Sequence, residues 1–169
     1  MKKNVLVGQS GGPTAVINAS LYGVVTESLK HDEEIDTVYG MVNGIEGFLA
    51  DHYLDLSHTL GSRELELLKL TPAAYLGSCR FKLPDISKDR EIYDKIFDIV
   101  NKMEIKYFFY IGGNDSMDTI KKLSDYSLLN GSDIRFMGVP KTIDNDLAAT
   151  DHTPGYGSAA KYIGSITKE

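Results

Sequence analysis

The sequence has no tryptophan, only one cysteine and no run rich in lysine or arginine. The single cysteine, Cys79, excludes an internal disulfide, so we expect a protein of a reducing, cytoplasmic compartment. The missing basic run and the net charge of −6 argue against binding to nucleic acid or to an anionic membrane. No apolar stretch reaches the length that spans a bilayer. An anionic ligand would therefore need a local cluster of positive charge or of backbone N–H groups.

The composition is that of an ordinary globular protein. Hydrophobic residues make up 42% of the chain and charged residues 25%. A length of 169 residues corresponds to one domain and suffices for a sizeable core.

Short apolar runs alternate with amphipathic segments along the chain. The expected strands are residues 4–9, 36–42, 107–111 and 135–139. The expected helices are residues 16–30, 44–50, 62–70, 88–103, 116–129 and 155–166. Strands that are apolar on both faces and alternate with helices predict an α/β fold, with three α/β/α layers and a mostly parallel sheet.

The first expected strand leads into Gly8-Gln9-Ser10-Gly11-Gly12-Pro13, which precedes a helix. Glycines let backbone N–H groups approach an anion, and the start of the helix adds positive potential. The spacing matches neither the dinucleotide-binding fingerprint nor a Walker P-loop. These residues alone are equally compatible with a tight turn that binds nothing.

Two further polar loops follow the strands expected at 107–111 and 135–139. They are Gly112-Gly113-Asn114-Asp115-Ser116 and Pro140-Lys141-Thr142-Ile143-Asp144-Asn145-Asp146. Glycines, carboxylates and a lysine at the carboxyl ends of adjacent strands suit metal-assisted phosphoryl transfer. In an extended loop, Asp144 and Asp146 would point to one side. The alternatives are that Asn114 or Asp115 caps a helix in the first loop and that the second loop is an acidic surface turn.

These segments, in this order, resemble the phosphofructokinase family, and in detail its pyrophosphate-dependent branch, over essentially the whole chain. The resemblance implies a Rossmann-like N-terminal lobe. The first loop is similar to the family's first phosphate loop, whose second glycine, here Gly12, contacts the donor phosphate. Leu76-Gly77-Ser78-Cys79-Arg80 resembles a segment whose arginine, here Arg80, holds the transferred phosphate.

The loop at 112–116 bears on the choice of donor. Relatives that use ATP have glycine at the position of Asp115, whereas pyrophosphate users commonly have aspartate. A carboxylate there repels the ATP α-phosphate, since like charges ~4 Å apart cost about 4 kcal/mol at an effective dielectric near 20. The resemblance implies that Gly113 and Ser116 bind pyrophosphate. It also implies Mg²⁺ as cofactor, with Asn114 in place of the family's metal-binding aspartate.

The loop at 140–146 bears on the chemistry. Lys141 stands where ATP-dependent relatives usually have glycine, and the resemblance implies that it stabilises charge on pyrophosphate. By the same resemblance, Asp144 is the general base for the sugar 1-hydroxyl, and Asp146 helps to position the phosphate and the metal. The residues implied to bind the sugar phosphate are Thr142, Ile143 and Asp144.

The implied reaction is the Mg²⁺-dependent, reversible transfer of a phosphoryl group from pyrophosphate to the 1-hydroxyl of D-fructose 6-phosphate, in glycolysis or gluconeogenesis. An ATP-dependent phosphofructokinase and a truncated, non-catalytic phosphate-binding module are the alternatives. Family members are longer than this chain, so residues 1–169 are expected to be a donor-binding N-terminal lobe without the C-terminal lobe. We expect the intact protein to be a homodimer or homotetramer.

Overall fold

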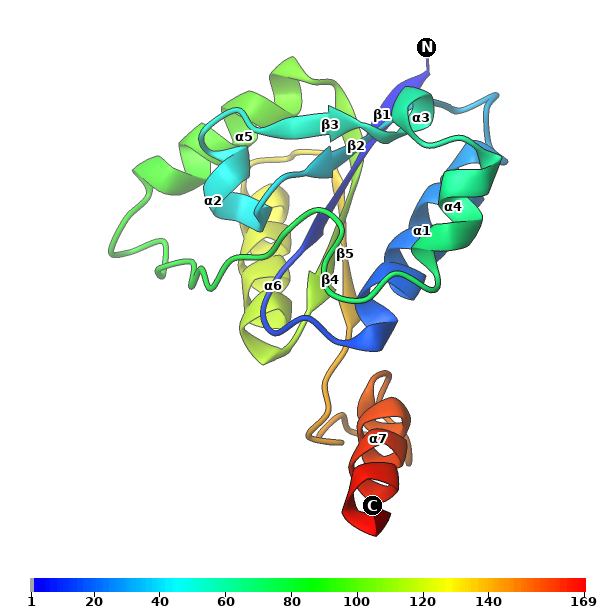
Figure 1. The fold of residues 1–169 in the computed structure, drawn as a ribbon. Helices are drawn as coiled ribbons and strands as arrows, with labels where there is room; N and C mark the ends of the chain where they lie inside the picture. The colour runs from blue at the N-terminus through cyan, green and yellow to red at the C-terminus, as the bar shows by residue number, and fades with distance from the viewer. Residues whose placement is uncertain (1) are drawn as a thin grey trace.

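Five strands form one sheet in the computed structural model, which describes residues 2–169 (Figure 1). Their order across the sheet is β3-β2-β1-β4-β5. The bounds are β1 Lys3–Gln9, β2 Ile35–Met41, β3 Tyr53–Asp55, β4 Ile105–Gly112 and β5 Arg135–Pro140. The four strands expected from the apolar runs are all present, and they pair in parallel with one another.

The sequence analysis missed β3, which pairs antiparallel with β2 at the edge of the sheet. This strand has three residues, and two of them, Tyr53 and Leu54, are exposed. Such a segment is too short to show the alternation that identifies a strand in a sequence.

Seven helices are found in the described chain. Their bounds are α1 Ala15–Leu29, α2 Gly44–Phe48, α3 Leu56–Thr59, α4 Ser62–Leu68, α5 Glu91–Lys102, α6 Asn114–Leu129 and α7 Tyr156–Lys168. Helix α3 is a single turn that the sequence analysis did not predict. The expected start of α5 at residue 88 is wrong, because Asp89 accepts the N–H of Ile92 and the residues before it form a separate turn.

The helices cover both faces of the sheet and create two separate cores. Leu6, Phe108 and Tyr110 pack under α2, α5 and α6. Val5 and Val7 pack on the opposite face with α1, α3 and α4. Successive residues of β1 therefore enter different cores, which explains why this strand is apolar throughout. The three-layer α/β/α fold is confirmed.

Strand β1 lies between β2 and β4 (Figure 1). The strands that follow β1 in the sequence are first added on one side of it, as β2 and β3, and then on the other side, as β4 and β5, so the strand order reverses at β1. In parallel α/β sheets this switch point, at the carboxyl ends of the strands, is where ligands bind. Helix α7 projects from the same end, away from the body of the molecule (Figure 1).

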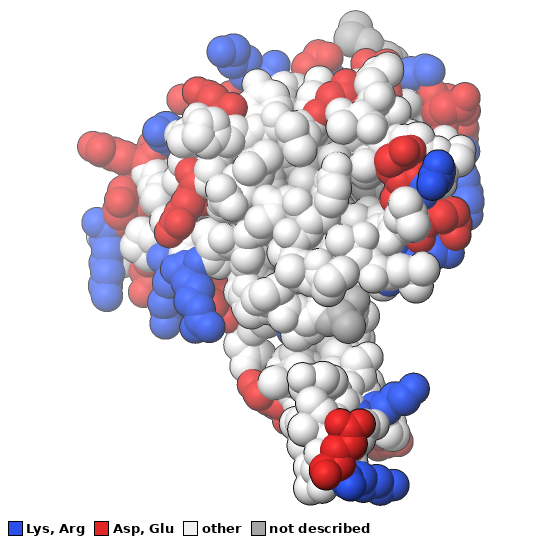
Figure 2. Space-filling view, viewed as in Figure 1, with Lys and Arg blue, Asp and Glu red and all other residues white. Residues whose placement is uncertain are grey.

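Acidic and basic side chains are mixed around the rim of the face shown in Figure 2, and the centre of that face is largely uncharged. Among the described residues, no helix combines the length and the apolar character needed to cross a membrane.

Candidate active site

Loops from distant parts of the sequence meet where β1 and β4 end. The hydroxyls of Ser10, after β1, and Ser116, in the first turn of α6, are hydrogen-bonded and buried. Gly112 lies beneath this pair, and a Cβ there would come 2.0 Å from Ser116 Oγ and 2.8 Å from Ser10 Oγ. Glycine at position 112 is therefore required for the two loops to touch.

The turn after β1 is held by Gly11, whose φ of 74° lies in the left-handed region that favours glycine. Its N–H donates to Cys79 O at 3.0 Å, and its carbonyl accepts from Ser78 Oγ at 2.5 Å. Gly12 has open space around its Cβ position, and no acceptor among residues 2–169 takes its N–H. Gly12 is thus the accessible glycine, as a phosphate contact requires, and Gly11 is the structural one.

The loop that carries Arg80 lies against this turn. The Arg80 side chain is exposed, whereas Cys79 is buried with its Sγ 3.7 Å from the Tyr110 hydroxyl. Burial raises the pKa of Tyr110. Cys79 is therefore a small packing residue, and its neighbour Arg80 extends from the same loop toward solvent.

Lys141 follows β5 and is only 4% exposed. Its Nζ lies 3.6 Å from the position that a Cβ on Gly11 would occupy, so the ammonium is beside the first glycine turn. Burial, and secondly the positive charge of Arg80, hold the pKa of Lys141 below its ordinary value of 10.5. The described residues provide no carboxylate within ion-pairing distance of either cation.

Helix α6 begins directly after the second glycine pair. Its N-cap is Gly113, so the alternative that Asn114 or Asp115 caps the helix is wrong. Asn114 and Asp115 are exposed in the first turn, and Ser116 faces inward. The exposed N-terminus of a 16-residue helix thus lies at the site, and it favours negative charge.

Residues 142–155 form a loop that is closed at its base. The N–H of Thr142 donates to Pro154 O at 2.9 Å, and the N–H of Asp144 donates to Thr142 Oγ1 at 3.0 Å. Asn145 has a φ of 54° and accepts the N–H of Thr153 at 2.9 Å. The backbone therefore turns at Asn145, and the expectation of an extended loop around this residue is wrong.

Asp144 and Asp146 are both exposed, as is Ile143 at 51%. Asp146 Oδ2 accepts a hydrogen bond of 2.9 Å from Asn114 Nδ2, which joins the loop to α6. In the described part of the chain, no three His, Cys, Asp or Glu side chains cluster as a metal site would require. Mg²⁺ commonly binds through one or two carboxylates plus substrate phosphates, so these oxygen ligands still fit it.

The family model for phosphofructokinase matches residues 4–169. This chain belongs to the phosphofructokinase family. It is 45% identical over 166 residues to the pyrophosphate--fructose 6-phosphate 1-phosphotransferase of Halomonas elongata, covering 98% of this chain and 39% of that protein. It is 46% identical over 162 residues to the enzyme of the same name from Rhodospirillum rubrum, covering 96% and 38%.

Among solved structures, the pyrophosphate-dependent phosphofructokinase of Nitrosospira multiformis superimposes with a TM-score of 0.90 at 42% identity, covering 98% of this chain and 40% of that one. The chain thus spans about two fifths of the length of the relatives that it matches. The resemblance seen in the sequence and the expected α/β fold are both confirmed.

In this phosphofructokinase chain, the structure brings most of the predicted site residues to one end of the sheet. Sequence reasoning missed Gln9 and Asn18, two fully buried amides behind the first glycine turn. The signals available were a glutamine at the end of an otherwise apolar strand and an asparagine that fits the family's continuation of the first glycine loop. The catalytic and binding roles assigned to individual residues stay predictions.

Proposed function

We propose that these residues form the pyrophosphate-binding part of an enzyme that phosphorylates the 1-hydroxyl of D-fructose 6-phosphate. The observation that supports this most directly is Lys141, a buried ammonium placed against a glycine turn and beside Arg80. Burying a charge without a partner is costly, and an anion placed between the two cations would remove that cost. The names of the two bacterial relatives state the same donor and acceptor.

The donor would be held by groups of different kinds. The open N–H of Gly12 and the start of α6 offer hydrogen bonds and positive potential to phosphate oxygens. Arg80 can bind a phosphate in a bidentate manner, while Lys141 acts as a point charge. Together they would stabilise the negative charge that develops on the leaving phosphate.

The acceptor would be activated by Asp144. As the 1-hydroxyl oxygen attacks the terminal phosphorus of pyrophosphate, the bond to the bridging oxygen breaks and phosphate leaves. The hydroxyl proton passes to the Asp144 carboxylate. This residue is exposed, so a sugar phosphate could reach it, and Thr142 Oγ1 holds its backbone N–H at 3.0 Å. Thr142 and Ile143 would contact the sugar phosphate from the same loop.

Magnesium would be held by Asp146 and by the amide oxygen of Asn114, together with phosphate oxygens of the substrate. When bound, the ion neutralises phosphate charge and aligns the donor. The hydrogen bond between Asn114 and Asp146 keeps the two side chains together.

The preference for pyrophosphate over ATP would come from Asp115, which is exposed in the first turn of α6. The test is a phosphotransfer assay of the full-length gene product with fructose 6-phosphate and either donor. We expect turnover with pyrophosphate alone. A double variant, Asp115→Gly with Lys141→Gly, should gain use of ATP, whereas Asp118→Ala on the same helix should not. Turnover with ATP alone by the unmodified protein would overturn the proposal, and binding of pyrophosphate without turnover would favour a non-catalytic module.

We also propose a cytoplasmic location and a homo-oligomeric state for the full-length protein. A free, buried thiol at Cys79 suits a reducing compartment. Cell fractionation and light scattering of the purified gene product would test the two proposals separately.

A further inference from the structure

Two buried amide side chains lie behind the first glycine turn. Gln9 ends β1, Asn18 lies in the first turns of α1, and both are 0% exposed. Gln9 Nε2 donates to Asn18 Oδ1 at 2.9 Å and to Ile17 O at 3.1 Å. The pair therefore joins the end of the strand to the start of the helix.

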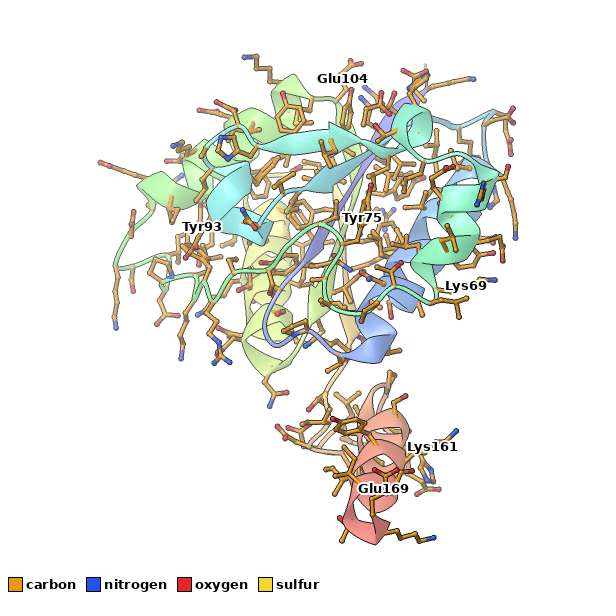
Figure 3. The ribbon with its side chains drawn as sticks, viewed as in Figure 1. Lys69, Tyr75, Tyr93, Glu104, Lys161 and Glu169 are labelled. Atoms are coloured by element: carbon orange, nitrogen blue, oxygen red, sulfur yellow. The ribbon has the colours of Figure 1, made fainter. Side chains whose placement is uncertain are left out.

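The same two amides also hold the loop that crosses in front of the sheet between α4 and α5. The N–H of Leu76 donates to Gln9 Oε1 at 2.9 Å, and the N–H of Tyr75 donates to Asn18 Oδ1 at 2.8 Å. Asn18 Nδ2 donates to Thr71 O at 2.8 Å. Figure 3 shows Tyr75 on this crossing loop.

These partners settle which way each amide points. A backbone N–H can only meet an acceptor, so the side-chain oxygens, and not the nitrogens, must face Leu76 and Tyr75. Each side-chain nitrogen in turn donates to an oxygen. A buried network in which each side-chain nitrogen and oxygen has a partner favours one arrangement of its loops over others.

The hydrogen bonds lead directly to the candidate phosphate contacts. Beyond Leu76, the loop is tied to Gly11 through Ser78 Oγ and Cys79 O. The next residue is Arg80, whose exposed side chain lies within electrostatic reach of Lys141 but makes no ion pair with a described carboxylate. The position of the Arg80 backbone, from which the guanidinium extends, is therefore set by the loop behind it.

We propose that Gln9 and Asn18 are positioning residues for pyrophosphate binding, which hold the Arg80 loop against the glycine turn. This inference rests on the proposed function. The inference goes beyond the proposed function because it assigns a role to two residues that would not touch the donor. Their truncation should weaken donor binding because the backbone that carries Arg80 would no longer be held against the glycine turn.

The test uses Asn18→Ala and Gln9→Met in the full-length gene product, assayed with pyrophosphate and fructose 6-phosphate. Each variant should raise the KM for pyrophosphate about 10-fold, in the range expected when a supporting contact behind a binding site is lost. The KM for fructose 6-phosphate should change less than about twofold, since uniform loss of structure would affect both substrates.

A double-variant cycle separates positioning from stability. In an Arg80→Ala background, Asn18→Ala should cause no further rise in the KM for pyrophosphate, because the arginine through which it acts is gone. Equal effects in both backgrounds would overturn the proposal.

Asn4 provides a matched control at the opposite end of β1. It also joins elements through its side chain, donating to Met103 O at 2.7 Å and accepting from the N–H of Thr37 at 3.1 Å. Asn4→Ala should lower the Tm, as Asn18→Ala does, and leave the KM for pyrophosphate unchanged.

The outcomes of these experiments distinguish a failure of this inference from a failure of the proposed function. If the unmodified enzyme does not use or bind pyrophosphate, the proposed function and this inference both fail. If it uses pyrophosphate, but Gln9→Met and Asn18→Ala leave that KM unchanged while lowering the Tm, the two amides are structural and only this inference fails. Should Asn18→Ala not fold, Gln9→Met, which keeps the length of the side chain, decides the question.

Discussion

The donor side and the acceptor loop of the candidate site are built differently. On the donor side, defined as residues 9–12, 76–80, 112–116 and Lys141, hydroxyls, amides and backbone groups are buried and bonded to one another. In the acceptor loop, residues 142–155, the side chains of Asp144, Asp146 and Asp151 are exposed and the backbone is hydrogen-bonded mainly at its base.

This difference has a physical reason. Pyrophosphate is small and highly charged, and preorganised dipoles bind such a ligand best because they need not reorient. An exposed loop with few buried contacts can move at little cost and adapt to a second substrate. The donor side should therefore respond to mutation through packing as well as binding, and the acceptor loop through chemistry alone.

Asp144→Asn should have the largest effect. Loss of a general base lowers kcat by roughly 10²–10⁴-fold, whereas an exposed side chain of this kind contributes less than about 0.5 kcal/mol to stability. Steady-state kinetics and thermal unfolding of the full-length protein would measure both quantities. Asp151→Asn, exposed in the same loop, is the control. A loss of less than about 10-fold would mean that Asp144 is not the base.

Lys141→Met should act on binding and on stability in opposite directions. Pyrophosphate affinity should fall about 10²-fold, the usual cost of removing a charge-stabilising group. The free protein should become more stable, because a buried ammonium without a carboxylate partner is replaced by an apolar chain of similar length. Calorimetric titration and thermal unfolding in phosphate-free buffer would test this, and a less stable variant would contradict it.

The same lysine predicts a pH dependence. Because the pKa of Lys141 is held below 10.5 in the folded protein, the unfolded chain binds more protons between the lowered value and 10.5. Stability from this group should therefore rise with pH across that window. Urea unfolding at a series of pH values should give a steeper rise for the unmodified protein than for Lys141→Met, and parallel curves would argue against the effect.

Two glycines sharpen the contrast between packing and binding on the donor side. Gly112→Ala should destabilise the protein by about 2 kcal/mol, because the added methyl meets the Ser10–Ser116 pair. Gly12→Ala has open space and should change stability by less than about 0.5 kcal/mol while raising the KM for pyrophosphate. If Gly12→Ala alters neither quantity, the accessible glycine is not a donor contact.

Asn114→Asp tests the link between the two regions and should have the smallest effect. Replacing the hydrogen bond to Asp146 by two adjacent carboxylates should destabilise the metal-free protein by about 0.5 kcal/mol, since both groups are exposed. Added Mg²⁺ should then raise the Tm more for this variant than for the unmodified protein. The control Asn101→Asp, remote on α5, should show no such additional rise in Tm. If Mg²⁺ raised the Tm of all three proteins equally, Asn114 would not be part of the metal site.

Much of the fold followed from the sequence because its signals are local. The apolar runs of β1, β2, β4 and β5 and the periodic helices predicted the layers correctly. The errors lie where the signal is weak, namely the three-residue β3, the one-turn α3, the start of α5 and the turn at Asn145. The glycine loops could also be predicted, since glycine after an apolar strand indicates a turn regardless of where that strand lies in the sheet.

The sequence by itself determined the fold class, the family and the set of residues that could bind phosphate, because each depends on residue types at short, regular spacing. Only the tertiary structure decided which of them meet. It placed Lys141 beside Gly11, although 130 residues separate them in the sequence, and it joined Asn114 to Asp146. It alone showed that Gln9 and Asn18 hold the Arg80 loop, because a hydrogen bond between distant segments depends on how the chain packs and leaves no periodic pattern in the sequence.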